Sequence, residues 1–196
     1  MREKAMTRRL PVLGFVGSSG SGKTTLLEHV VGLLADAGAR LAVLKHAKAG
    51  FDIDRNPGKD SHRLRSAGAD QVLVASRDRW ALMALQPDPL REPSLEEMLR
   101  HLDAAVLDGA LVEGFGHEHY PKIEVYRPAH GRPPQCWPHD ASVVAVATDV
   151  PLATGSASRL DLNDPVSVAR FVACELGLPE LQLESARGFA RESNRV

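Results

Sequence analysis

A glycine-rich stretch, GSSGSGKTT at residues 17–25, carries the clearest chemical signal in this sequence. It fits the pattern G-x-x-x-x-G-K-[ST], in which successive backbone N–H groups cradle the phosphates of a nucleotide. In such a loop Lys23 would reach the β- and γ-phosphates, and the hydroxyl of Thr24 would bind Mg²⁺. We therefore predict a phosphate site made by Gly17, Ser18, Ser19, Gly20, Ser21, Gly22, Lys23, Thr24 and Thr25.

A nucleotide-bound Mg²⁺ needs an acidic ligand in addition to the Thr24 hydroxyl. Glu113 closes the apolar stretch ALVEG and stands beside Gly114. Ligands of open α/β sheets bind at the carboxyl ends of strands, which is where this carboxylate would lie. A solvated acid at a strand end is the plainer alternative, and we favour the metal ligand.

Asp60 is the preferred acid for ordering the chain around the γ-phosphate or for orienting a water, because Lys59 beside it could also reach phosphate. Asp52 and Asp54 compete for this role, and aspartates are also common turn residues. We predict Asp60 and Glu113 as the catalytic acids. The predicted metal ligands are Thr24, Glu113 and Asp60.

Two further constellations are less specific. Asp149 ends an apolar stretch, where its carboxylate could accept hydrogen bonds from guanine N1–H and the exocyclic amine, although an aspartate there also suits a turn. His117 and His119, with Cys136 or His139, could bind zinc. Their spacing is not that of a closed site, and a solvated pair of loop histidines is the favoured interpretation.

The phosphate loop needs a buried strand before it and a helix after it. Residues 10–16 (LPVLGFV) are nearly all apolar, as in a strand buried on both faces. After the loop, apolar residues recur at helical spacing until Gly38, which predicts the end of the helix. A second strand at 41–47 completes a right-handed βαβ unit and a parallel sheet.

The rest of the chain indicates an α/β protein. Residues 48–60 read as a loop followed by a short helix, and two alternating stretches at 70–76 and 79–85 predict a hairpin that adds antiparallel strands to the sheet. We expect an arm at 1–9, one domain at 10–177 and a peripheral helix or tail at 178–196. Other predicted elements are a helix at 94–103, strands at 109–115, 122–128 and 143–149, a covering loop at 130–140, and a helix from Asp164-Pro165 to Gly177.

Composition excludes several classes of protein. The formal net charge is −1 and no basic run is longer than Arg8-Arg9, so a nucleic-acid partner is disfavoured. Two cysteines without a CxxC pair suit a reducing compartment. The segment MREKAMTRRL lacks the apolar core of a signal peptide, and no apolar run is long enough for a membrane span. We therefore expect a cytoplasmic protein.

Four stretches taken together are more specific than the phosphate loop alone. In their order and spacing they resemble the MobB family of molybdopterin-guanine dinucleotide biosynthesis adaptor proteins, over residues 10–172. The stretches are GFVGSSGSGKTTLLEHV, KHAKAGFDIDRNPGKDSHRLRSAGA, LVEGFGHEHYPKIEVYR and VVAVATD.

The resemblance implies a three-layer P-loop NTPase fold and a GTP-binding homodimer with intertwined β-rich arms and little GTPase activity. Its partner would be the guanylyltransferase MobA, which joins GMP to molybdopterin. Asp60 in GKDS and Glu113 in VEGF match the acidic positions of the family, and Lys122 and Arg127 match basic ones. Two departures are the stretch Lys48-Ala49-Gly50, where histidines are frequent, and Gly116, where a basic residue is common.

Two other functions compete with the GTP-binding adaptor. A small-molecule P-loop kinase would need a lid rich in arginine, and Arg63 and Arg65 are the only plausible pair. A metallochaperone GTPase would deliver metal through His117-Glu118-His119. The sequence shows no evident arginine finger in cis and no glutamine placed to activate water, so we expect a protein that is at most a weak GTPase.

Overall fold

The structure is a computed structural model, and it describes residues 9–47, 60–86, 88 and 90–179. These residues form two compact units, one made by the chain up to His46 and from Leu95 onward, the other by residues 47–94. Each unit is described by itself. Most of the predicted arm and tail lies outside the described residues, and the single domain expected for 10–177 stays a prediction.

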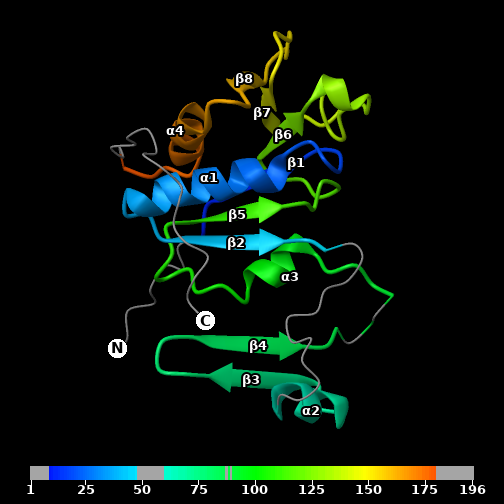
Figure 1. Cartoon of the computed structure of the whole chain (residues 1–196), viewed down its shortest axis with the longest axis vertical. Helices are drawn as coiled ribbons and strands as arrows, with labels where there is room; N and C mark the ends of the chain where they lie inside the picture. The colour runs from blue at the N-terminus through cyan, green and yellow to red at the C-terminus, as the bar shows by residue number, and fades with distance from the viewer. Residues whose placement is uncertain (1–8, 48–59, 87, 89, 180–196) are drawn as a thin grey trace, which may run out of the picture. The chain divides into compact units, whose positions relative to one another are not determined.

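The first unit is built on a six-stranded sheet in which every pair of neighbours is parallel. Its order is β2-β5-β1-β6-β7-β8, so that β1, which leads into the phosphate loop, lies between β5 and β6 (Figure 1). The parallel sheet predicted from the sequence is confirmed. The strands are β1 (Val12–Val16), β2 (Leu41–Lys45), β5 (Gly109–Glu113), β6 (Lys122–Tyr126), β7 (Val143–Thr148) and β8 (Ser158–Asp161).

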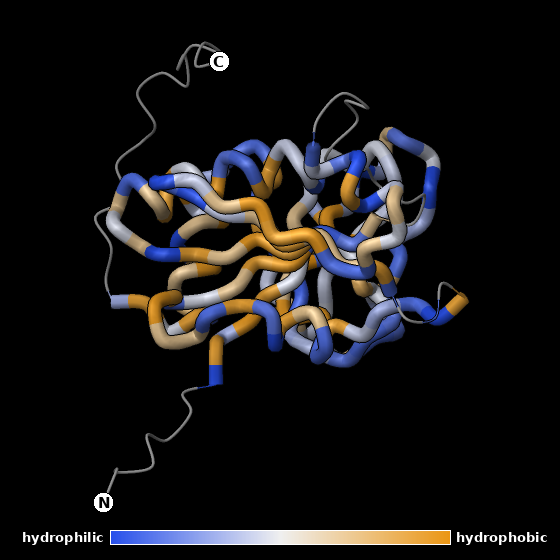
Figure 2. The backbone as a smooth tube through the Cα atoms, turned by 90° about the horizontal axis from the view of Figure 1, so that it is seen from below, coloured by the Kyte–Doolittle hydropathy of each residue, from blue (hydrophilic) through white to orange (hydrophobic). Residues whose placement is uncertain are grey.

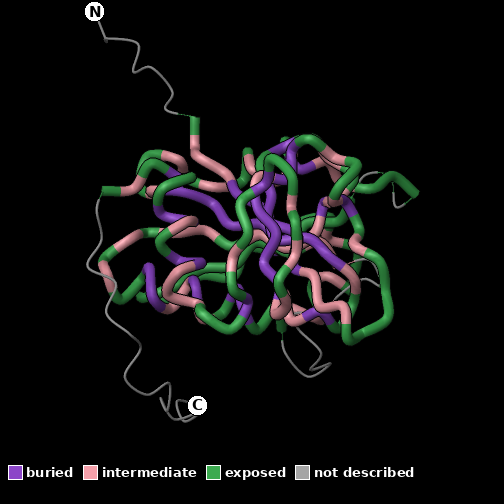
Figure 3. The backbone as a smooth tube through the Cα atoms, turned by 90° about the horizontal axis from the view of Figure 1, so that it is seen from above, coloured by how far each residue is buried: buried purple, intermediate pink, exposed green. Residues whose placement is uncertain are grey.

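Sequence patterns did not reveal β8. It is short and mostly exposed, and it pairs with β7 at the edge of the sheet. A strand of this kind carries no buried apolar run, which is the signal by which the central strands were found. The central strands β1, β5 and β7, by contrast, are nearly all buried. Hydrophobic segments of the backbone are orange in Figure 2, and buried segments are purple in Figure 3.

Helices and loops cover the two faces of this sheet. Helices α1 (Lys23–Asp36) and α4 (Pro165–Glu175) pack in the largest hydrophobic cluster, together with Leu13, Phe15 and Leu111. Helix α3 (Leu95–Leu99) packs against Val112 on another cluster. Since Leu111 and Val112 are neighbours on one strand, they point to opposite faces, and the first unit has three layers.

Strand β6 has one apolar and one charged face. Ile123 and Val125 join the cluster with α1 and α4. Lys122 and Glu124 alternate with them and therefore point to the other face, yet both are fully buried. The loops after β5 and β6 cover these two charges, and this determines much of the candidate site.

The second unit contains α2 (Asp60–Ser66) and a hairpin of β3 (Gln71–Ala75) and β4 (Trp80–Ala84). The two strands pair in antiparallel register, as predicted. They form a sheet of their own, however, and do not extend the six-stranded sheet as the sequence analysis expected. Alternation of side chains defines a hairpin but does not say which other strand it pairs with.

None of the helices in the described residues is long and apolar enough to cross a membrane.

The start of α4 offers a direct test of the local folding rules. The Asp164 side chain accepts hydrogen bonds from the backbone N–H groups of Val166 and Ser167, and Pro165 follows it. We expect Asp164→Ala to lower the free energy of unfolding by about 1 kcal/mol, because two helix N–H groups lose their acceptor. Asp164→Asn should retain most of the stability. Urea unfolding measures both, with the exposed Asn163→Ala as control, and a loss as large in the control would contradict the capping role.

Candidate functional site

The predicted phosphate loop connects β1 to α1 in a form that only glycine allows at its first position. Gly17 has φ of 136°, and a Cβ there would collide with the backbone oxygen of Val125. Gly22, just before α1, has φ of 95°. Left-handed backbone of this kind is open to glycine and strained for other residues. The loop is therefore held tightly against β6, with its N–H groups around the start of α1.

The Lys23 side chain folds back over the middle of the loop, at Ser18 and Ser19, which we call the crest of the loop. Its Nζ donates to the carbonyl of Ser18 at 2.8 Å. The Ser21 side chain is buried, and its Oγ has no hydrogen-bond partner among the described residues. A buried polar atom without a partner is costly, so it marks a place where a further polar group fits. The Lys23 ammonium group and the unpartnered Ser21 hydroxyl are groups that suit a phosphate.

A hydroxyl and a carboxylate, both predicted from the sequence as metal ligands, meet beside this loop. The Thr24 Oγ1 donates to Glu113 Oε1 at 2.9 Å, and the Glu113 side chain is only 12% exposed. Lys45, at the end of β2, donates to the other carboxylate oxygen at 3.0 Å. Oxygen ligands of these two types are those that Mg²⁺ prefers. The residues present therefore fit a magnesium ion between Thr24 and Glu113.

A sharp turn after β5 places the Glu113 carboxylate. Gly114 has φ of 101° and Phe115 has φ of 51°, which is a strained backbone for a bulky side chain. The Gly114 N–H donates to the carbonyl of Phe15 in β1, and the Tyr120 hydroxyl donates to the Gly114 carbonyl at 2.6 Å. These contacts stabilise the strained turn and so fix the position at which Glu113 leaves the sheet.

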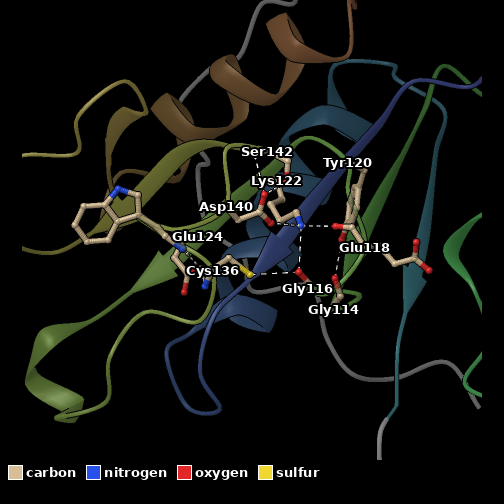
Figure 4. A network of polar contacts seen from close by, with 10 residues as sticks. Gly114, Gly116, Glu118, Tyr120, Lys122, Glu124, Cys136, Asp140 and Ser142 are labelled. Carbon is tan, nitrogen blue, oxygen red and sulfur yellow. Dashed lines mark hydrogen bonds and ion pairs between the residues drawn. The ribbon is translucent and has the colours of Figure 1, made fainter.

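Lys122 lies at the centre of a buried polar network beneath this turn (Figure 4). Its ammonium group donates to the carbonyls of Gly116 and Glu118 and to Asp140 Oδ2 at 2.8 Å. It also lies 4.9 Å from the centre of the Tyr120 ring. A buried charge is tolerated only when it is paired and hydrogen-bonded, and here every partner belongs to the covering loops. Lys122 is therefore a structural cation, fully buried and out of reach of a ligand.

Burial determines the protonation of this network. It raises the pKa of the Tyr120 hydroxyl, helped by Cys136 and Glu118, and it raises the pKa of the Cys136 thiol, with Glu124 adding to the effect. For Asp140, burial acts upward, but the hydrogen bonds from Lys122 and Ser142 outweigh it and lower the pKa to about 2. Tyr120 therefore remains a hydrogen-bond donor, and Cys136 is a thiol rather than a reactive thiolate.

Glu124 holds the second covering loop. Its carboxylate accepts the backbone N–H groups of Gln135, at 2.7 Å, and of Cys136 and Trp137. Gln135 in turn accepts the N–H of Gly17 through Oε1 at 3.3 Å. The loop that the sequence analysis predicted at 130–140 to cover something therefore lies against the phosphate loop, and a buried carboxylate fixes it there.

Asp149 follows β7 at the same edge of the sheet. Its Oδ2 accepts from Arg127 Nη1 at 2.9 Å, while Oδ1 is buried and has no hydrogen-bond partner among the described residues. The side chain is 18% exposed. Arg127 extends from the end of β6 toward Gly22, where a Cβ would lie 3.9 Å from its Nη2. The geometry thus joins Asp149 to the phosphate loop through Arg127, and the predicted role in base recognition stays a prediction.

The other acids predicted from the sequence belong to the segment between β2 and α3. Asp60 begins α2 in the second unit, with a side chain 91% exposed and 3.6 Å from Arg63, and its role stays a prediction. Asp52 and Asp54 lie outside the described residues. Within the described residues, His, Cys, Asp and Glu nowhere gather in threes around a possible metal ion. His117 instead lies near the rings of His46 and Phe115.

The site can now be compared with known proteins. The family model described as MobB, molybdopterin guanine dinucleotide synthesis protein B, matches residues 12–149. The chain belongs to the MobB family. The matched range runs from the first residue of β1 to Asp149 and so contains the phosphate loop, Glu113 and both covering loops.

Two curated members of the MobB family are similar over most of their length. The molybdopterin-guanine dinucleotide biosynthesis adapter protein of Escherichia coli K12 is 45% identical over 163 residues, 83% of this chain and 91% of its own. That of Haemophilus influenzae is 39% identical over 168 residues, 85% of this chain and 90% of its own. The crystal structure of Bacillus subtilis MobB has a TM-score of 0.68 at 24% identity, covers 85% of this chain and 98% of its own, and supports the fold.

Sequence reasoning missed four residues of the site: Lys45 at the end of β2, Glu124 in β6, and Arg132 and Gln135 in the covering loop after β6. A signal for one of them was present, because KIEVY places Lys122 and Glu124 two residues apart within an otherwise apolar strand. Charges at that spacing share a face. In a central strand they indicate a polar network under a loop.

The Asp140 carboxylate should make stability depend on pH. Its pKa is about 2 in the folded protein and ordinarily 3.8, so the unfolded chain takes up this proton first as the pH falls. We expect the free energy of unfolding to decrease between about pH 5 and 2. In Asp140→Asn this contribution is absent, so the difference between wild type and variant should shrink toward low pH. Urea unfolding at pH 5, 4 and 3, with Asn163→Ala as an uncharged control, measures it, and a difference independent of pH would contradict the assignment.

Proposed function

We propose that this protein binds GTP with Mg²⁺ on the 17–25 loop and acts as the adaptor of the guanylyltransferase MobA in making molybdopterin guanine dinucleotide. Membership of the MobB family supports the pathway. The observation that carries the nucleotide is the hydrogen bond of 2.9 Å between Thr24 and Glu113 beside the phosphate loop. A hydroxyl from the start of α1 and an acid from the end of β5, brought together there, would form the two halves of a magnesium site.

In this proposal the phosphates lie in the loop between Gly17 and Thr25. The loop N–H groups and the start of α1 supply donors and positive potential for them. Lys23 exchanges the Ser18 carbonyl for phosphate oxygens. Thr24 and Glu113 would hold Mg²⁺, and Lys45 would keep the carboxylate in place. When bound, the ion neutralises charge on the terminal phosphates.

We propose that the base is guanine and that Asp149 recognises it. The carboxylate at the end of β7 lies at the edge of the sheet that also presents the phosphate loop. Arg127 fixes one of its oxygens, and the other, Oδ1, lacks a partner in the described structure. Guanine offers N–H donors to a carboxylate there, whereas adenine does not present them in that pattern. A site built to satisfy a hydrogen bond discriminates strongly against a ligand that lacks it.

The proposed role is to hold GTP rather than to turn it over. Gln135, the glutamine at the loop, is engaged with the Gly17 N–H and so is tied to the start of the loop. Glu113 is paired with Lys45 and Thr24. With these two groups engaged, we expect slow hydrolysis, and nucleotidyl transfer is left to MobA. We place the protein in the cytoplasm, where this synthesis would take place.

Calorimetric titration of GTP and ATP, each with Mg²⁺, tests the nucleotide. We expect GTP to bind in preference to ATP and Lys23→Ala to weaken GTP binding by roughly 10- to 100-fold, because a charged hydrogen bond to phosphate is lost. Glu113→Ala should reduce the dependence on Mg²⁺, and Asp149→Ala should bring GTP and ATP to similar affinities. Arg170→Ala, on the exposed face of α4, is the control. Preference for ATP would instead favour the small-molecule kinase.

We also propose a homodimer formed through the hairpin. Leu73 faces Leu82 across the two strands and Ala75 faces Trp80, so these four side chains share one face. Leu73 is 62% and Trp80 is 67% exposed, which is unusual for large apolar side chains. An apolar face and open strand edges of this kind favour association with a second chain.

Light scattering after gel filtration tests the dimer. We expect the wild-type protein to elute as a dimer and Trp80→Asp combined with Leu82→Asp to shift it to a monomer, because charges would be buried in the interface. Arg77→Ala, at the exposed hairpin turn, should leave the mass unchanged. A wild-type monomer, or a double variant that remains dimeric, would contradict this interface.

A further inference from the structure

Residues 127–137, which we call the strap, run along the phosphate loop in the opposite chain direction. Arg132 Nη1 donates to the Ser19 carbonyl at 3.3 Å, and Gln135 accepts the Gly17 N–H at the same distance. The contacts of the strap therefore run along the loop from the C-terminal end of the loop to its N-terminal end. The facing pairs are Arg127 with Gly22, His130 with Gly20, Arg132 with Ser19, and Gln135 with Gly17.

Both ends of the strap are fixed to the sheet. At one end Glu124, fully buried, binds three consecutive backbone N–H groups from Gln135 to Trp137. At the other end Arg127 pairs with Asp149. A segment held in this way presents its middle residues at a defined place, with little ordering left to occur when a ligand binds.

Arg132 is the cation in the middle of the strap. Its partner, the Ser19 carbonyl, adjoins the Ser18 carbonyl that accepts from Lys23 at 2.8 Å. Two cations therefore lie on neighbouring carbonyls at the crest of the loop. Arg132 is exposed, and no carboxylate among the described residues pairs with it. A neutral carbonyl is a weaker partner for a guanidinium than an anion, and a phosphate group matches its planar fork of donors.

We propose that Arg132 is a further ligand of the terminal phosphates, supplied in cis by the strap. It exchanges the Ser19 carbonyl for a phosphate oxygen when the nucleotide binds, beside the oxygen held by Lys23. The proposal rests on the proposed nucleotide site and adds to it a residue outside the glycine loop. It also explains why a strap anchored by a buried carboxylate lies over a loop that already carries its own lysine.

This role predicts a preference among phosphate chains. A cation at the crest of the loop, next to Lys23, contacts the last phosphates of a triphosphate more than those of a diphosphate. We expect Arg132→Ala to weaken GTP binding about tenfold, equivalent to about 1.4 kcal/mol, and GDP binding about threefold or less. Arg132→Lys should lie between wild type and alanine, because it keeps the charge but loses the planar fork.

The experiment is calorimetric titration of GTP, GDP and inorganic tripolyphosphate, each with Mg²⁺, into wild type, Arg132→Ala, Arg132→Lys and the control Arg170→Ala. Tripolyphosphate carries the phosphates without the base. A thermal unfolding scan of each variant checks that the exposed position leaves the fold intact.

Two outcomes would overturn the inference: unchanged GTP affinity in Arg132→Ala, or equal losses for GTP and GDP. Equal losses would show that Arg132 only shapes the loop. If the wild-type protein binds tripolyphosphate through Arg132 but does not prefer GTP, the proposed function fails while the inference stands. If GTP binds tightly and Arg132→Ala has no effect, the inference alone fails.

Discussion

Two buried charges on one strand govern the carboxyl edge of the sheet. Lys122 and Glu124 point to the face of β6 that no long helix covers, and both are removed from solvent. A buried charge is costly unless its hydrogen bonds are made, and here the partners are backbone groups of two loops together with Asp140. The charges therefore fix the course of both loops.

The chemistry of the site follows from those two loops. Beneath the first, the Lys122 network holds the strained turn at Gly114 and Phe115, so that Glu113 leaves the sheet beside Thr24. The second, held by Glu124, lies along the phosphate loop and brings Arg132 to its crest. The glycine loop is the candidate phosphate site, and its acidic and basic partners come from β5 and the strap.

This arrangement suits a protein that holds its ligand. Lys23 and Arg132 donate to carbonyls of the loop, and Gln135 and Glu113 are engaged in structural contacts. Such a site favours tight binding in the ground state, whereas rapid turnover requires groups reserved for the transition state. Holding a nucleotide for a partner is the task of an adaptor, which accords with membership of the MobB family.

The sequence alone determined the parallel βαβ core, the hairpin and the cap of α4, because local pattern and strand order are enough to place them. On the same grounds it predicted Thr24 and Glu113 as metal ligands. It did not reveal β8, the separate sheet of the hairpin, or the contacts of Arg132 and Gln135 with the loop. Those depend on which segments meet across the sheet. Arg132 lies 113 positions from Ser19 in the sequence, and Gln135 lies 118 positions from Gly17. These residues become neighbours because β1 pairs with β6 and the buried charges of β6 hold the strap against the loop.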